Sequence, residues 1–139
     1  MGEPSEADLA ASEVRLVELI FPHQTNHIGT LFGGNALALM DKAAFLSATR
    51  FARRSMVTVA SDRVEFKVPV RAGQLVELVA RVTRIGRTSV TVGVEMYAEE
   101  LLSPARVLAT QGSFLFVAID ERGRPIPVRD EDGQSPSDP

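Results

Sequence analysis

The 139-residue sequence contains no cysteine and only two histidines. The absence of cysteine excludes disulfide bonds, a thiolate metal site and a cysteine nucleophile. Two histidines alone do not supply the ligands of a conventional structural zinc site, so we expect no metal ion. No apolar run approaches the roughly 18 residues that a membrane-spanning helix requires, and we therefore expect no membrane insertion.

The chain also carries little excess charge, with a formal net charge of −3 at pH 7. This balance gives no electrostatic reason to expect a nucleic-acid partner. The first eight residues are polar and acidic, unlike a secretory signal or transit peptide, and we expect a cytoplasmic protein. A hydrophobic content of 45% and a charged content of 24% are typical of one globular domain.

Residues 34–53 form the best helical pattern in the sequence, and this pattern carries a carboxylate on its apolar side. At about 100° per residue, Asp41 falls between Leu37 and Phe45. Lys42 and three arginines gather on the opposite side of the helix. Because an ionised carboxylate is rarely buried unless a partner pairs with it or a reaction uses it, Asp41 is a candidate catalytic residue. The alternative is an aspartate that caps a neighbouring element or pairs with an arginine.

The rest of the chain has the period-two pattern of strands. We predict strands at residues 14–21, 56–66, 74–85, 89–99 and 106–119. Short turns join the last four, which favours antiparallel pairing against the single long helix. The predicted domain spans residues 14–124, with a frayed or weakly helical segment at residues 1–13 and a flexible tail at residues 125–139. One helix covers little of such a sheet, so its edges require a partner, and we expect a homo-oligomer.

Two blocks of this sequence resemble the signature of the hot-dog-fold acyl-CoA thioesterases. The first reads HQTNHIGTLFGG at residues 23–34 and LMDKAA at residues 39–44; the second reads VTVAS at 57–61, FKVPVRAG at 66–73 and VTRIGRTSV at 82–90. The resemblance extends over about residues 14–119 and is nearest to the bacterial hydrolases of short- and medium-chain acyl-CoA. It implies an α+β hot-dog fold, in which an antiparallel sheet of five to six strands wraps one long central helix. It further implies a homodimer assembled into a tetramer or hexamer, and no cofactor besides the coenzyme A of the substrate.

The resemblance also implies roles for three residues in the reaction. Asp41 would act as general base on water, or would itself attack the thioester to form an anhydride. Asn26 of a partner subunit would face Asp41 and position the water or the carbonyl, although an asparagine here can equally form an Asx turn. The backbone N–H of Gly34, at the start of the helix, would polarise the thioester carbonyl. The alternative for Gly34 is an ordinary glycine between a loop and a helix.

A larger set of residues is predicted to bind the substrate. Arginine with adjacent hydroxyls suits the phosphates of coenzyme A, and the resemblance assigns the turn at residues 87–89 to its nucleotide. The complete predicted binding set is Phe32, Gly33, Thr58, Arg63, Arg87, Thr88 and Ser89. We assign no chemical role to His23 or His27, because their four-residue spacing has no fixed geometry in a loop.

Two other functions compete with the thioesterase. A hot-dog dehydratase or hydratase relies on a catalytic histidine with an acidic partner, and the His-Phe-Pro-Gly type of motif is absent from this sequence. A non-catalytic acyl-CoA-binding module would usually carry an effector domain, for which this chain has no room. Measuring free-thiol release from acyl-CoA separates both alternatives from the thioesterase.

Overall fold

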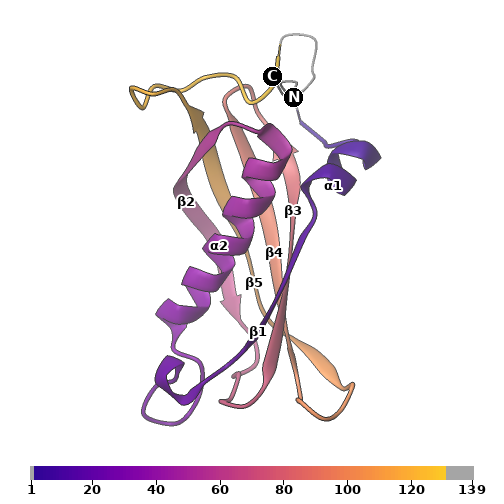
Figure 1. The fold of residues 1–139 in the computed structure, drawn as a ribbon, viewed down its shortest axis with the longest axis vertical. Helices are drawn as coiled ribbons and strands as arrows, with labels where there is room; N and C mark the ends of the chain where they lie inside the picture. Colours follow the sequence, from indigo (N-terminus) through magenta and orange to yellow (C-terminus); the bar gives the residue numbers. More distant parts are fainter. Residues whose placement is uncertain (1, 131–139) are drawn as a thin grey trace.

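The computed structural model describes residues 2–130 and has one long helix against a five-stranded sheet (Figure 1). The elements in chain order are α1 (Glu6–Ser12), β1 (Val14–Leu19), the 3-10 helix η1 (Pro22–Gln24), α2 (Gly33–Ala52), β2 (Ser55–Phe66), β3 (Leu75–Ile85), β4 (Ser89–Glu99) and β5 (Arg106–Ile119). The sheet order is β1-β3-β4-β5-β2, and every pairing is antiparallel. The expected α+β hot-dog architecture is confirmed, with five strands and with β1 and β2 at the edges. Within residues 2–130, no helix is long and apolar enough to cross a membrane.

The central strand β4 shows why this sequence forms a sheet with one buried face. Its side chains alternate between buried and half-buried along the whole strand, as period-two geometry requires. The buried set faces α2 and consists of Val90, Val92, Val94, Met96 and Ala98. The opposite face carries Thr91, Gly93, Glu95 and Tyr97, so the outer surface of the sheet is polar.

Helix α2 packs on the sheet through small side chains. Five alanines on its inner face are almost completely buried, namely Ala36, Ala43, Ala44, Ala48 and Ala52. The helix ends at Arg53, which has a left-handed backbone (φ 54°) and donates its N–H to the Thr49 carbonyl at 2.7 Å. The buried face is centred nearer to Met40 than the sequence pattern predicted. Asp41 therefore lies at the edge of this face and is only partly buried, which corrects the expectation that it lies inside.

The N-terminal segment, which we expected to be flexible or weakly helical, contains the packed helix α1. Ser5 and Asp8 form a capping box, in which the Asp8 N–H donates to Ser5 Oγ at 3.1 Å and the Ser5 N–H donates to Asp8 Oδ2 at 2.9 Å. Ser12 is completely buried, and its Oγ accepts the Val82 N–H at 3.0 Å. A seven-residue helix shows little periodicity, which explains why the sequence pattern did not reveal it.

The first part of the expected C-terminal tail is also packed. Val128 is only 1% exposed, and its N–H donates to the Arg87 carbonyl at 2.9 Å. The Ile126 N–H donates to the Ala118 carbonyl of β5 at 2.9 Å. The predicted tail is therefore wrong for residues 125–130, while Met1 and residues 131–139 lie outside the described part of the chain.

Candidate active site

Asp41 lies on the third turn of α2 and faces the edge strand β2. Thr58 of β2 points towards the helix, because its strand partner is the fully buried Phe116. The Thr58 hydroxyl donates to Asp41 Oδ1 at 2.7 Å. Within residues 2–130, Oδ2 has no hydrogen-bond partner and no cation pairs with the carboxylate. The structure thus excludes a partner arginine within the described chain, and it leaves one carboxylate oxygen available to a substrate or a water molecule.

Helix α2 begins with a pair of glycines whose backbone N–H groups are available. The Ala36 N–H donates to the Phe32 carbonyl at 3.0 Å and makes the first bond of the helix, and the N-cap residue contributes no side-chain bond. Within the described chain, the N–H groups of Gly33 and Gly34 have no acceptor, as expected for the first turn of a helix. A Cβ atom on Gly34 would lie 3.1 Å from the Phe32 ring. Glycine is therefore the residue that leaves these donors open to a ligand.

Asn26 is held within its own loop by a set of local hydrogen bonds. Its Oδ1 accepts the N–H groups of Ile28 and Thr30, both at 3.1 Å. Its Nδ2 donates to Thr30 Oγ1 at 2.9 Å. The loop is tied to α2 because Asn35 Nδ2 donates to the Gln24 carbonyl at 2.9 Å. Asn26 thus forms the Asx turn that was the alternative reading, and the turn fixes the orientation of the side chain.

Asp41 and Gly34 are too far apart for one chain to bring both to the same atom. Seven residues separate them on α2, which corresponds to about 10 Å along the helix axis. A general base and an oxyanion donor must both lie within about 3 Å of the reacting atoms. One copy of the chain therefore does not complete a site that uses both groups.

A cavity of about 280 Å³ lies beside the start of α2. Its lining residues come from the loop before the helix, the helix start, the end of β2, the segment that follows β2, and β5: Thr30, Leu31, Gly33, Ala36, Phe66, Val68, Pro69, Val70 and Thr110. A Cβ atom on Gly33 would lie 3.8 Å from Phe66 Cζ, so the aromatic ring lies beside the helix start. Sequence reasoning missed Phe66 as a site residue. The available signal was an aromatic residue at the end of a strand, followed by the VPV segment.

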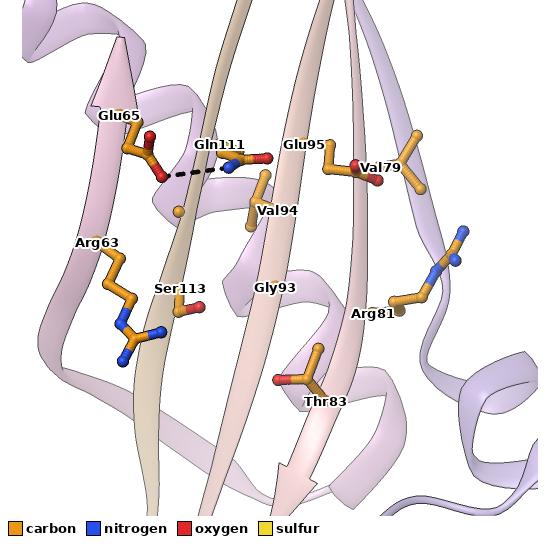
Figure 2. Close-up of a pocket in the computed structure, with 11 residues that line it drawn as sticks. Arg63, Glu65, Val79, Arg81, Thr83, Gly93, Val94, Glu95, Gln111 and Ser113 are labelled. Atoms are coloured by element: carbon orange, nitrogen blue, oxygen red, sulfur yellow. Dashed lines mark hydrogen bonds between the residues drawn. The ribbon is translucent and has the colours of Figure 1, made fainter. Parts of the chain in front are cut away.

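Arg63, which we predicted to bind substrate, lies on the opposite face of the sheet from α2. It follows Asp62 in an irregular part of β2 and has a left-handed backbone (φ 54°). Its side chain lies on the face of the sheet away from α2, in a hollow that it shares with Arg81 and Glu95 (Figure 2). The structure therefore does not bring Arg63 together with Asp41 in one chain. The extra residues in β2 shift the strand register, and period-two reading did not reveal them.

The turn at residues 87–89 has a well-defined backbone and an exposed arginine. The Gly86 N–H donates to the Ser89 carbonyl at 2.7 Å, and the Ala118 N–H donates to the Thr88 carbonyl at 2.9 Å. The turn joins β3 to β4 at the end of the sheet that lies beside the last turn of α2 (Figure 1). Within one chain, this turn therefore lies near the end of α2, whereas Asp41 lies on the third turn of the helix.

The two histidines lie outside the group around Asp41. Both are exposed, and the His23 ring stacks on Phe21 with 6.0 Å between the ring centroids. Neither histidine bonds to a carboxylate within residues 2–130. In the same described range, no group of three or more His, Asp or Glu side chains is arranged to hold a metal ion.

Comparison with known proteins identifies the family. A family model described as the thioesterase superfamily matches residues 28–119. The chain belongs to the thioesterase superfamily. It is 37% identical over 128 residues to an uncharacterized acyl-CoA thioester hydrolase of Bacillus subtilis, covering 92% of this chain and 74% of that protein. These matches confirm the resemblance inferred from the sequence blocks.

Solved structures of this superfamily have the same fold. An acyl-CoA hydrolase from Staphylococcus aureus, in complex with butyryl coenzyme A and coenzyme A, is 31% identical with a TM-score of 0.82, covering 86% of this chain and 73% of that chain. A hexameric acyl-CoA thioesterase is 38% identical with a TM-score of 0.83, and the match covers 89% of this chain and 83% of that chain. The S. aureus hydrolase has also been solved as alanine variants of an asparagine, an aspartate and a threonine. These three lie in this order along its chain, 15 and 17 residues apart.

Proposed function

We propose that this chain hydrolyses acyl-CoA thioesters to a carboxylic acid and coenzyme A, with Asp41 acting at the thioester carbonyl. The observation that carries the proposal is the Asp41 carboxylate, held by Thr58 at 2.7 Å with its second oxygen unengaged within the described chain. The comparison with the S. aureus hydrolase supports it. Asn26, Asp41 and Thr58 are also 15 and 17 residues apart, as are the three positions changed to alanine in that enzyme.

In the general-base form of the reaction, Asp41 Oδ2 takes a proton from water as the water attacks the acyl carbon. The N–H of Gly34 donates to the oxygen that becomes negative in the tetrahedral intermediate. The carbon–sulfur bond then breaks, and the proton passes from Asp41 to the departing thiolate. In the alternative form, the carboxylate attacks the acyl carbon directly, the carbon–sulfur bond breaks and the thiolate of coenzyme A leaves. Water then hydrolyses the resulting anhydride, which releases the carboxylic acid and restores Asp41. Both forms use only groups of the chain and water, without a further cofactor.

The proposed site combines two copies of the chain. Because about 10 Å of helix separates Gly34 from Asp41, Asp41 of one copy would face Gly34 and Asn26 of another. Strand β2 is an unpaired edge that exposes Val57 (39%) and Val59 (51%) beside this site. We propose a homodimer that pairs through this edge, and an assembly of dimers into a tetramer or hexamer. The hexameric thioesterase of the same superfamily supports the larger assembly.

The nucleotide of coenzyme A would bind at the turn of residues 87–89. The Arg87 side chain is exposed and has no acceptor within residues 2–130, and arginine is well suited to phosphate oxygens. Thr88 and Ser89 add hydroxyl groups to the same turn. A cytoplasmic location is part of this proposal, because coenzyme A thioesters are intracellular metabolites.

The decisive experiment measures free-thiol release from a panel of acyl-CoA thioesters of different chain lengths. The wild-type chain should release thiol, and Asp41→Asn should lower kcat by about a hundredfold or more, the range of general-base catalysis. Asp62→Asn removes an exposed carboxylate from β2 and serves as the matched control. Near-wild-type turnover by Asp41→Asn would overturn the proposal. Hydration of an enoyl-CoA without thiol release, or binding without turnover, would instead indicate a hydratase or a binding module.

A further inference from the structure

Residues 125–130 pack as an ordered clasp across the end of the sheet that carries the turn of residues 87–89. The clasp crosses from β5 towards the N-terminal segment that contains α1 (Figure 1). The Val128 N–H donates to the Arg87 carbonyl at 2.9 Å, and the Val128 side chain is 1% exposed. The main chain of Arg87 is therefore bonded directly to a buried residue of the clasp.

The clasp is held at two points by charged side chains from elsewhere in the chain. Arg54, directly after α2, donates to the Val128 carbonyl at 2.8 Å and to Asp130 Oδ1 at 2.9 Å. Arg129 pairs both of its terminal nitrogens with the two oxygens of Asp8, at 3.3 Å each. Such two-pronged arginine–carboxylate pairs are geometrically specific as well as strong. The clasp thus joins the end of α2 and helix α1 to the turn.

Both partners of the Asp8–Arg129 pair are largely removed from solvent, with 17% and 23% of their side chains exposed. Burial alone would raise the pKa of Asp8, but the hydrogen bonds from the Ser5 N–H, Arg129 and the Ser5 hydroxyl lower this pKa on balance. The Arg129 guanidinium also lies 5.2 Å from the centre of the Phe51 ring. Asp8 is therefore ionised at neutral pH and carries the charge opposite to that of Arg129.

We propose that the clasp is a positioning device for the coenzyme A nucleotide. This proposal rests on the proposed function of the turn. The Arg87 side chain is free to reach a phosphate, while its main chain is fixed by Val128 on one side and by the bond from Ala118 to the next residue on the other. Loss of the Val128 bond would allow the turn to move. Arg87 would then become ordered only when the substrate binds. The free-energy cost of this ordering lowers the affinity for coenzyme A.

The readout is the difference between two substrates with the same acyl group. Acyl-CoA carries the nucleotide, whereas the matching acyl-pantetheine thioester lacks it. Val128→Pro removes the N–H that Arg87 accepts, and Val128→Ala shortens the side chain but keeps that N–H. We expect Val128→Pro to raise KM for acyl-CoA about fivefold relative to Val128→Ala. Complete loss of a hydrogen bond to a charged group costs about tenfold or more in affinity, and this variant should weaken the contact of Arg87 with the phosphate without removing it. The value of kcat, and both constants for acyl-pantetheine, should differ little between the two variants.

Arg87→Met supplies the reference for the turn itself. It should raise KM for acyl-CoA and leave acyl-pantetheine unaffected, and combining it with Val128→Pro should add little, because both changes act through Arg87. If Arg87→Met discriminates between the substrates while Val128→Pro matches Val128→Ala, the clasp proposal is wrong and the role of the turn stands. If Arg87→Met does not discriminate, the nucleotide site is wrong, and the clasp proposal fails with it.

A second variant tests the same proposal if Val128→Pro does not fold. Arg54→Met removes the two bonds that hold the clasp to the end of α2 without touching the backbone of residues 125–130. Its matched control is Arg122→Met, which removes an exposed arginine of the neighbouring turn. Arg54→Met should again raise KM for acyl-CoA alone, and equal effects on both substrates would overturn the proposal. Circular dichroism and thermal unfolding of each variant establish that the fold is retained.

Discussion

The Thr58 hydroxyl donates a 2.7 Å hydrogen bond to Asp41 Oδ1, and this bond connects the middle of α2 to the edge strand β2. Thr58 was predicted to bind substrate, yet within one chain it contacts the carboxylate. Its hydroxyl occupies Oδ1, and Oδ2 has no hydrogen-bond partner within residues 2–130. We therefore propose that Thr58 is a positioning residue for Asp41.

Removal of this bond should reduce turnover. Thr58→Val keeps the shape of the side chain and deletes the hydroxyl, and we expect kcat to fall about tenfold, as for loss of one bond to a charged group. Thr58→Ser retains the donor and should restore most of the rate. Steady-state kinetics with one acyl-CoA measure both variants. A Thr58→Val enzyme with the wild-type kcat would show that the bond has no part in the reaction.

Adding a single methyl group at the helix start should affect catalysis and not stability. In Gly34→Ala the new Cβ lies 3.1 Å from the Phe32 ring, which must shift, and it stands beside the N–H donors that we propose bind the thioester carbonyl. We expect kcat/KM to fall about tenfold through misplacement of the carbonyl. The melting temperature should stay the same or rise, because alanine is the better helix former. Gly33→Ala, with its nearest neighbour at 3.8 Å, is the control and should lose less activity.

The pair of Asp8 and Arg129 should make stability depend on pH in the acidic range. Against the effect of burial, the hydrogen bonds that Asp8 accepts in the folded protein lower its pKa below the ordinary value of 3.8. Its contribution to stability is therefore present above pH 3.8 and disappears as the pH falls through the lower, folded-state pKa. Asp8→Asn should therefore destabilise the protein by about 1 kcal/mol near neutral pH. The difference from the wild type should shrink as the pH falls below 3.8. Urea unfolding across this range and at neutral pH tests this, with Glu121→Gln as an exposed-carboxylate control; a difference independent of pH would contradict it.

A charge placed on the exposed edge strand should prevent assembly. Val59 is 51% exposed in the single chain, and a lysine on an edge strand opposes pairing with another strand. We expect Val59→Lys to yield a smaller species by light scattering and to lose turnover, since one copy does not complete the site. Its unfolding free energy per chain at high dilution should change by less than about 0.5 kcal/mol.

The control for this variant is Val107→Lys, which places the same charge on an exposed position of β5 (45% exposed). This variant should keep the wild-type size and activity. Full activity from a monomeric Val59→Lys protein would contradict the composite site.

Much of the fold was predictable because it follows from the spacing of apolar residues within each element. The strands at residues 89–99 and 106–119 were placed at their observed bounds. The first alternates over its full length, and the second alternates over its second half. The packing of α1 and of residues 125–130 was not predictable. Ser12 is buried by a bond to Val82, and Val128 by a bond to Arg87. These contacts join residues about 40 or 70 positions apart, so the spacing of apolar residues within one helix or strand does not reveal them.

The candidate site likewise contains residues that the sequence revealed and residues that it did not. The spacing of Asn26 and Asp41 was visible in the sequence, because it belongs to one contiguous block. The position of Arg63 was not visible, because extra residues in β2 turn it to the outer face of the sheet. Phe66 was also missed as a site residue, since only the three-dimensional packing brings its ring beside Gly33.

The hydrogen bonds that hold Asn26 to Thr30 have a consequence for how two copies would meet. The loop reaches its final shape within a single chain, so no segment there must fold during the encounter. Two rigid surfaces that dock without rearrangement typically associate at about 10⁵–10⁷ M⁻¹s⁻¹. The appearance of activity after dilution and reconcentration would then follow second-order kinetics set by collision, without a slow first-order phase.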